Sequence, residues 1–444
     1  MQVLAPAHAL TSTPAENAHD LLHLYREVRS WTRELCAPLE PEDYVAQSMP
    51  DASPTKWHIA HVSWFFETFL LKPHLERYAP LHPQYDFLFN SYYNYVGERH
   101  CRAKRGVVSR PTVAQAWEYR EWVDEHMARL LCEAGPEQLQ VLAPLIAIGL
   151  HHEQQHQELL LTDIKHLFSE NPLLPAYSER SSVGQAQAQT PRWVEFEEGL
   201  YEIGHESSGS ALQAFAFDNE GPRHRQFLQA FALCDRLVSN GEFLRFMRED
   251  GYSRPELWLS EGWATVQSEN WRAPFYWEKR GEKWHSFTLA GLREVDEAEP
   301  TCHLSYFEAD AFARWAGARL PSEAEWEVAA LSLDASKMHS DGSFAEGRAF
   351  HPRAPQDHLA APRLRQMCGE VWQWTRSQYS AYPGYAPVEG ALGEYNGKFM
   401  CNQFVLRGAS CATPRSHARA TYRNFFPPSA RWQFSGLRLA RDLR

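Results

Sequence analysis

Apolar residues recur at helical spacing through about the first 170 of the 444 residues and lose that spacing afterwards. The first of four such segments carries Leu21, Leu24, Tyr25, Val28, Trp31 and Leu35, which fall on one face of a helix. The second segment opens with Ser53 as the expected cap residue and Pro54 at the first helical position. Thr112 with Gln115 three residues later opens the third with a capping-box pattern. Four consecutive amphipathic segments predict a helix bundle over residues 15–175.

The second half of the chain has a different character. Residues 176–192 are mostly small or polar, and we expect a linker there. Short strand-like stretches then alternate with turns rich in Gly, Pro, Asn and Trp. The one clear helix start is Ser322, with Glu325 three residues later. The sequence therefore predicts a multidomain chain, with an α bundle followed by an α+β part over residues 193–444.

Composition and charge narrow the classes of function. Lys and Arg number 44 and Asp and Glu 56, and the resulting net charge of −12 argues against nucleic-acid binding. No apolar run approaches the roughly 18 residues of a membrane span, and Met1–Thr13 lacks a signal-peptide pattern. The eight cysteines include no Cys-x-x-Cys pair, so we expect a cytoplasmic protein without a disulfide scaffold. The oligomeric state stays open, a homo-oligomer included.

Two histidines interrupt the apolar face of the fourth segment. His152 and His156 are four residues apart, which places both on one face of a helix, one turn from each other. An unsatisfied polar group costs roughly 1–3 kcal/mol when buried, and a metal ion would satisfy both imidazoles. His61, among aromatic residues of the second segment, is the expected third ligand, with His58 as the alternative.

The spacing alone does not name a metal. Three neutral imidazoles suit iron, copper, nickel or zinc, and hydrogen-bonded core histidines are the plainer interpretation. Residues 152–156 also match H-E-x-x-H, the zinc-protease motif in which Glu153 would be the general base. No convincing further ligand follows, because Glu170 and Glu179 lie in a Pro-containing exit from the helix. The motif therefore does not predict a protease.

Several motifs taken together resemble a known family. Residues 57–61 (Trp-His-Ile-Ala-His) and 152–156 (His-Glu-Gln-Gln-His) are similar to DinB-type bundles. The second half resembles the formylglycine-generating-enzyme/sulfatase-modifying-factor fold, a C-type-lectin-like domain, through residues 218–224, 238–243, 319–327, 369–375 and 434–440. In this order, over residues 18–443, the two halves resemble the ergothioneine-biosynthesis sulfoxide synthases of the EgtB type.

The resemblance implies a mononuclear non-haem Fe(II) held by His61, His152 and His156. It also implies an O2-dependent reaction that joins a thiol sulfur to the imidazole carbon between the two ring nitrogens of hercynine, Nα-trimethylhistidine. The sulfur becomes a sulfoxide in the same turnover, which gives hercynylcysteine S-oxide when the thiol is cysteine. Three histidines leave about three positions on an octahedral ion for the reactants.

The resemblance further implies a set of residues around the reactants. The substrate-binding residues are Gln155, Asn424, Phe425, Phe426, Arg99 and Arg102. Gln155 would hold the imidazole, the 424–426 stretch the betaine, and the two arginines the carboxylate of the thiol substrate. Tyr92 and Tyr93 are the candidate catalytic residues, because a phenol can donate a proton or hydrogen atom to the reacting oxygen. For each residue, packing in the core or solvation at the surface is the alternative.

Two departures from the families sharpen the expectation. Relatives that use γ-glutamylcysteine carry an acidic residue at the position of Phe426, so the apolar ring here favours free cysteine as the thiol. Formylglycine-generating enzymes use a cysteine pair after an Arg-Gly-Gly-Ser motif, but here Cys411 is followed by Thr413 and Ala418 at the matching positions. We therefore expect no sulfatase modification, and a buried structural role for Cys411.

Other activities are compatible with the same architecture. A selenoneine-forming relative would use a selenosugar, and a DinB bundle with three histidines can also hold zinc for thiol transfer or hydrolysis. Ovothiol-type synthases usually carry a further methyltransferase domain. A non-enzymatic protein could use the lectin-like half alone to bind a ligand.

Overall fold

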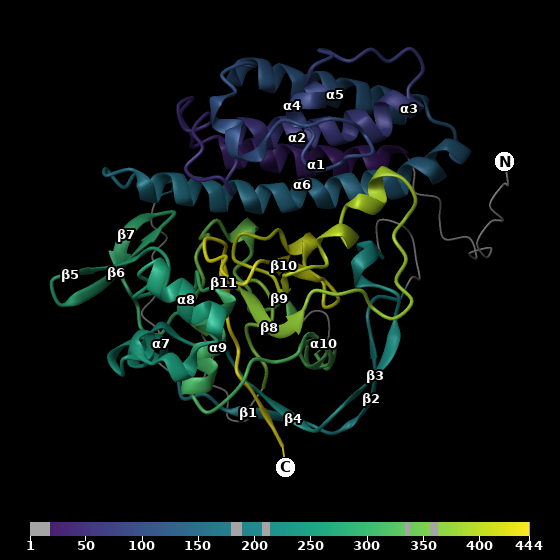
Figure 1. The fold of residues 1–444 in the computed structure, drawn as a ribbon. Coiled ribbons are helices and arrows are strands. Elements are labelled where there is room, and N and C mark those ends of the chain that lie inside the picture. Colours follow the sequence, from purple (N-terminus) through teal and green to yellow (C-terminus); the bar gives the residue numbers. More distant parts are fainter. Residues whose placement is uncertain (1–17, 179–188, 207–213, 334–337, 356–362, 444) are drawn as a thin grey trace.

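The computed structural model describes residues 18–178, 189–206, 214–333, 338–355 and 363–443. Met1–Thr13, where no signal peptide is expected, lies outside these ranges. So do residues 179–188, which form the larger part of the predicted linker. The described chain forms a helical layer followed by a mixed layer of small sheets and short helices (Figure 1). The predicted fold class is confirmed.

Four long helices build the first layer. They are α1 (Ala18–Cys36), α2 (Thr55–Phe66), α5 (Val113–Glu133) and α6 (Pro136–Glu170). The chain continues from α2 through a π-helical turn (Glu67–Leu71) into α3 (Lys72–His74), and α4 (Tyr85–Phe89) lies in the connection to α5. The predicted capping box at Thr112 is present. Pro54 caps α2 rather than occupying its first turn, and the Ser53 amide instead donates to the Asp163 carboxylate.

The helix α2 is the centre of the bundle. Every one of its twelve residues is buried, so it has no solvent-facing side. It packs closely on α6 at Gly149, where a Cβ would lie 2.6 Å from a ring carbon of Phe66. Because Gly149 lies one turn before His152, this close approach brings the histidines of the two helices within reach of each other.

The mixed layer contains four small sheets among the described residues. The central one has the strand order β10-β9-β8-β11 and consists of Trp372–Gln378 (β8), Phe404–Gly408 (β9), Asn424–Phe426 (β10) and Ser435–Gly436 (β11). A second sheet joins β1 (Trp193–Phe196), β4 (Phe231–Cys234) and β12 (Ala440–Asp442). The others pair β2 (Gly199–Ile203) with β3 (His224–Leu228), and β5 (Trp277–Arg280), β6 (Lys283–Thr288) and β7 (Gly291–Glu294).

This layer holds more helices than the sequence pattern predicted. Besides α10 (Glu323–Leu331), whose predicted capping box is present, it has α7 (Asn240–Arg248), α8 (Ser260–Ser268) and α9 (Tyr306–Trp315). Each is only nine or ten residues long, which is too short for a clear apolar period. Capping boxes at Ser239 and Ser305 precede α7 and α9 and would have revealed both.

The long helix α6 lies along the boundary between the two layers (Figure 1). One of its sides packs on α1 and α2, and other side chains reach the mixed layer. None of the described helices combines the length and the apolar character that crossing a bilayer requires. The position of α6 means that one helix can contribute both to a site inside the bundle and to a cavity between the layers.

Candidate functional site

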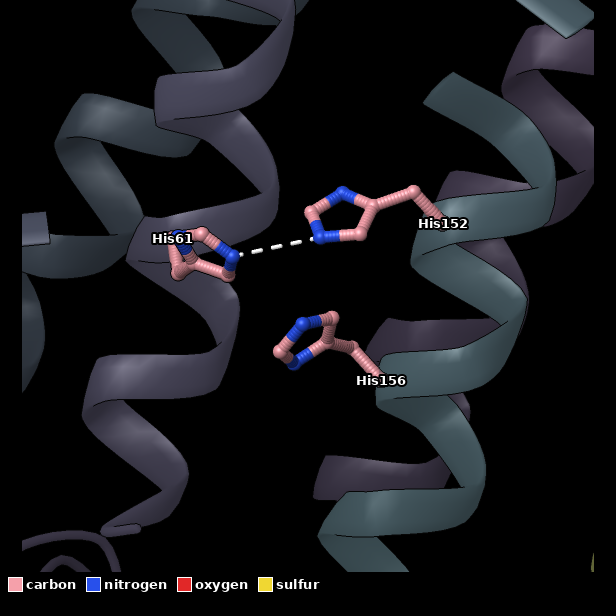
Figure 2. Close-up of side chains that lie close together, drawn as sticks. All are labelled: His61, His152 and His156. Carbon is pink, nitrogen blue, oxygen red and sulfur yellow. Dashed lines mark hydrogen bonds between the residues drawn. The ribbon is translucent and has the colours of Figure 1, made fainter. Parts of the chain in front are cut away.

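Three imidazoles converge between α2 and α6. His61 comes from α2, and His152 and His156 from successive turns of α6 (Figure 2). One ring nitrogen from each lies within 4.8 Å of the others, and His61 Nε2 is 3.2 Å from His152 Nε2. Among the described residues this is the one group of three or more His, Cys, Asp or Glu side chains that could share an ion. The structure thus brings together the three residues predicted as ligands.

Hydrogen bonds behind the cluster orient two of the three rings. His61 Nδ1 lies 2.6 Å from the carbonyl oxygen of Phe89, so this nitrogen carries the proton and Nε2 has a free lone pair. His58, the alternative ligand, does not join the cluster. Its Nδ1 instead lies 2.8 Å from Nδ1 of His156. His152 Nδ1 is buried without a hydrogen-bond partner among the described residues.

The cluster has the character of a metal site. Burial and the neighbouring imidazoles hold the pKa of His61 and His156 well below the usual range, and burial lowers that of His152 to about 3. All three rings are therefore neutral near pH 7 and offer lone pairs rather than protons. The bare Nε2 of His61 faces Nε2 of His152, so either a proton on His152 or a cation must lie between the two nitrogens. The donor set thus fits a divalent transition metal.

Glu153 points away from the histidines. It is fully buried and accepts hydrogen bonds from Arg29, Arg120 and Thr32. Burial raises the pKa of its carboxyl, but the two guanidinium groups outweigh this and leave the pKa below its ordinary value. A carboxylate held between two arginines is a structural anchor and cannot reach a reacting water, so the zinc-protease interpretation of residues 152–156 fails.

A cavity of about 260 Å³ opens beside the cluster, between α6 and the mixed layer. His152 and His156 line it, whereas His61 lies behind them. The predicted residues that line the cavity are Tyr92, Arg102, Gln155, Asn424, Phe425 and Phe426. Arg99 does not line it, because its side chain is exposed and donates to the Ser91 carbonyl. The structure therefore brings Arg102 alone of the two arginines to the cavity.

The two predicted catalytic tyrosines differ in position. Tyr92 lines the cavity, and its ring stacks on that of Tyr93 with 4.7 Å between centroids. Tyr93 is fully buried behind it, and burial raises the pKa of both phenols. Lys398 of the mixed layer donates to the Tyr92 carbonyl, and Glu394 accepts from the backbone amides of Asn94 and Tyr95. Tyr92 is thus held at the cavity by both layers.

Gln155 joins two phenols that the sequence analysis did not single out as site residues. Its Nε2 donates to the Tyr422 hydroxyl at 2.5 Å, and the Tyr395 hydroxyl donates to its Oε1. Both tyrosines line the cavity. The centroid of the Tyr395 ring is 5.7 Å from that of His152. Tyr395 belongs to no motif, and no spacing in the sequence would have found it.

Glu158 is the second functional candidate that the sequence analysis missed. It lines the cavity and is nearly fully buried, and its carboxylate accepts hydrogen bonds from Trp372, Ser410 and Thr413. Its partners among the described residues are neutral, and burial raises the pKa of its carboxyl. A signal did exist, because polar residues follow helical spacing along α6 at His151, Gln155, Glu158 and Thr162.

The 424–426 stretch forms one wall of the cavity. The Phe425 ring stacks on Tyr379 with 4.0 Å between centroids, and Phe426 meets Trp432 edge to face. Asn424 Oδ1 accepts a hydrogen bond from the backbone N–H of Phe425.

Cys411 is fully buried and free, and burial raises the pKa of its thiol well above the usual range. Such a thiol is a structural residue rather than a reactive one.

Comparisons with known proteins agree with this architecture. The model of the DinB superfamily matches residues 24–160, and that of the sulfatase-modifying factor enzyme 1-like domain matches residues 179–443. The chain is 30% identical to hercynine oxygenases of Mycolicibacterium smegmatis and Mycobacterium tuberculosis, covering 89% of this chain and 93% and 92% of theirs. It is also 23% identical to ergothioneine biosynthesis protein 1 of Schizosaccharomyces pombe, over 74% of this chain and 42% of that protein. The chain therefore belongs to the family of proteins with a DinB bundle and a sulfatase-modifying-factor-like domain that includes the hercynine oxygenases.

Proposed function

We propose that this protein is a non-haem iron(II) hercynine oxygenase of ergothioneine biosynthesis. Its reaction would join the sulfur of L-cysteine to the imidazole carbon of hercynine and produce hercynylcysteine S-oxide. The stoichiometry balances when one O2 supplies the sulfoxide oxygen and the oxygen of one water. That water takes its hydrogens from the S–H and C–H bonds that are lost. O2 thereby accepts the four electrons that the new C–S bond and the sulfoxide require.

The observation that carries this proposal is the face of neutral imidazoles beside a cavity at the boundary of the two layers. His61, His152 and His156 would hold the ion, and the ion would supply the redox chemistry with O2. A facial set of three protein ligands leaves positions open for reactants. Family membership favours this chemistry over zinc-dependent thiol transfer, which the same donor atoms would also allow.

The cavity also suits the charge pattern of hercynine. A quaternary ammonium has no N–H to donate, so aromatic faces and a nearby negative charge must bind it. Phe425 and Trp372 supply aromatic walls, and Glu158 supplies a buried carboxylate whose hydrogen-bond partners are neutral. We infer that Glu158 pairs with the trimethylammonium group and that Gln155 and Tyr395 orient the imidazole. Burial raises the pKa of Tyr92, so the phenol keeps its proton near pH 7 and could donate it to the reacting oxygen.

The thiol is proposed to be free cysteine. Phe426 lines the cavity and cannot form an ion pair with the ammonium of a glutamyl group. Arg102 lines the same cavity and could bind a carboxylate. We expect kcat/KM to be higher for cysteine than for γ-glutamylcysteine, and a clear preference for the dipeptide would overturn this choice.

The test of the function is anaerobic reconstitution with Fe(II), followed by O2 uptake and product mass with hercynine plus cysteine. O2 consumption should require both organic substrates, and the product mass should equal their sum plus one oxygen minus two hydrogens. The matched variants are His152→Ala, which should lose turnover, and His126→Ala, a histidine of α5 outside the cluster, which should keep it. Stoichiometric zinc without O2 uptake would instead support thiol transfer.

A further inference from the structure

A buried hydrogen-bond chain runs from the cluster to a carboxylate that does not line the cavity. Asp163, two turns after His156 on α6, accepts the Ser53 amide with Oδ2 at 2.8 Å. The same oxygen lies 3.0 Å from Nε2 of His58. The other nitrogen of His58, Nδ1, is 2.8 Å from Nδ1 of His156. All the side chains of this chain are buried or nearly so.

The chemistry of the donors and acceptors gives this chain one direction. A backbone N–H can only donate, so Oδ2 of Asp163 is an acceptor, and a carboxylate has no proton to offer. A neutral His58 therefore carries its proton on Nε2 and leaves Nδ1 bare. A bare Nδ1 accepts, so the proton between the rings belongs to Nδ1 of His156. The second nitrogen of His156, Nε2, is then bare.

We propose that Asp163 and His58 are positioning residues that keep His156 in the tautomer able to bind a metal ion through Nε2. This inference rests on the metal centre of the proposed function. The Phe89 carbonyl does the same for His61, but it belongs to the backbone and cannot be removed by substitution. His58 and Asp163 act on the tautomer of His156 through side chains, so substitutions can test their role.

The hydrogen bonds to His58 and Asp163 also affect how tightly His156 would bind a metal ion. A hydrogen bond that ends on a carboxylate increases the basicity of the imidazole it supports, and removing such partners typically weakens metal binding about 10–100-fold. The three proposed ligands are neutral, and Asp163 would contribute a negative charge behind His156 through His58. The chain explains why position 58 carries a histidine although its ring is not a member of the cluster.

The experiment compares three variants of the full chain. Each metal-free protein is titrated with Co(II), and binding is measured by visible absorption. His58→Phe fills the space but offers no acceptor to His156, and we expect its dissociation constant to rise 10–100-fold. His58→Asn leaves a void but restores a carbonyl acceptor, and we expect it to bind more tightly than His58→Phe. Asp163→Leu frees His58 to adopt either tautomer, and we expect a loss in the same direction.

The order of the two His58 variants separates positioning from packing. A residue that only fills space would make Asn the more damaging change, so tighter binding by His58→Phe than by His58→Asn would overturn the inference. Wild-type affinity in all three variants would overturn it as well. The control is His166→Phe, which removes a buried imidazole of α6 that bonds Ser48 and not the cluster. Its affinity should stay at the wild-type value.

Thermal unfolding of the metal-free variants shows which of them fold. The order of affinities needs both His58 variants, and if either fails to fold, the comparison of Asp163→Leu with the control His166→Phe decides the inference. Failure of this inference and failure of the proposed function give different results. Wild-type protein that binds neither Co(II) nor Fe(II) would overturn the metal centre and the inference together. Wild-type protein that binds metal, with His58→Phe binding as tightly, would overturn only the inference.

Discussion

The substitution Glu153→Gln tests the interpretation of the H-E-x-x-H sequence directly. Glu153 accepts hydrogen bonds from Arg29 and Arg120, and all three side chains are buried. In the variant, Arg29 keeps Asp124 at 2.7 Å, but Arg120 has no other carboxylate partner among the described residues. Removing one member of a buried ion pair costs about 3–5 kcal/mol, because an uncompensated charge remains.

This loss should be measurable by calorimetry or circular dichroism. A destabilisation of 1 kcal/mol lowers Tm by about 2–4 °C in a unit of 150–250 residues, so the helical layer should unfold about 6–20 °C lower. The control is Glu121→Gln. Glu121 and its partner Arg33 are both exposed, so loss of this ion pair should lower the free energy of unfolding by at most about 1 kcal/mol. A Glu153→Gln protein that unfolds at the wild-type temperature would refute the anchoring role.

The pH dependence of stability gives a second measurement on the same residue. The pKa of Glu153 is lower in the folded protein than its ordinary value of 4.5. Its contribution to stability is therefore present above that ordinary value and is lost as the pH falls toward the folded-state pKa. The Glu153→Gln protein should lack this part of the acid destabilisation.

Three further predictions concern the cavity and the bundle. Glu158→Gln should raise the KM for hercynine roughly 10- to 150-fold, the equivalent of about 1.5–3 kcal/mol for a hydrogen bond or ion pair to a charged group. Because the pKa of Glu158 is raised, the wild-type KM should also increase as the pH falls, and this dependence should be absent in the variant. Tyr92→Phe should reduce sulfoxide formation or divert O2 to oxidation of the thiol alone, whereas Tyr93→Phe should have the smaller effect in product analysis, since Tyr93 does not line the cavity. Gly149→Ala should cost about 1–3 kcal/mol in thermal unfolding and weaken metal retention, because the added methyl group meets Phe66 and separates α6 from α2.

Local patterns in the sequence were sufficient to predict the four long helices and part of the site. The four long helices follow from apolar spacing and capping residues, which depend on neighbours three or four positions away. For the same reason His152 and His156 could be placed on one helix face without knowledge of the fold. The short helices α7 and α9 were not predicted, because two to three turns of helix hold too few apolar residues to establish a helical periodicity.

The sequence alone therefore determined the helical layer, the change of architecture after α6 and the paired histidines of α6. Only the tertiary structure decided that His61 and not His58 joins them, because both residues lie on the same buried helix and differ only in which part of α6 they face. The tertiary structure also pairs Glu153 with two arginines, and it places Glu158 and Tyr395 at a cavity between the layers. These contacts join residues dozens to hundreds of positions apart, and their geometry depends on how the two layers pack.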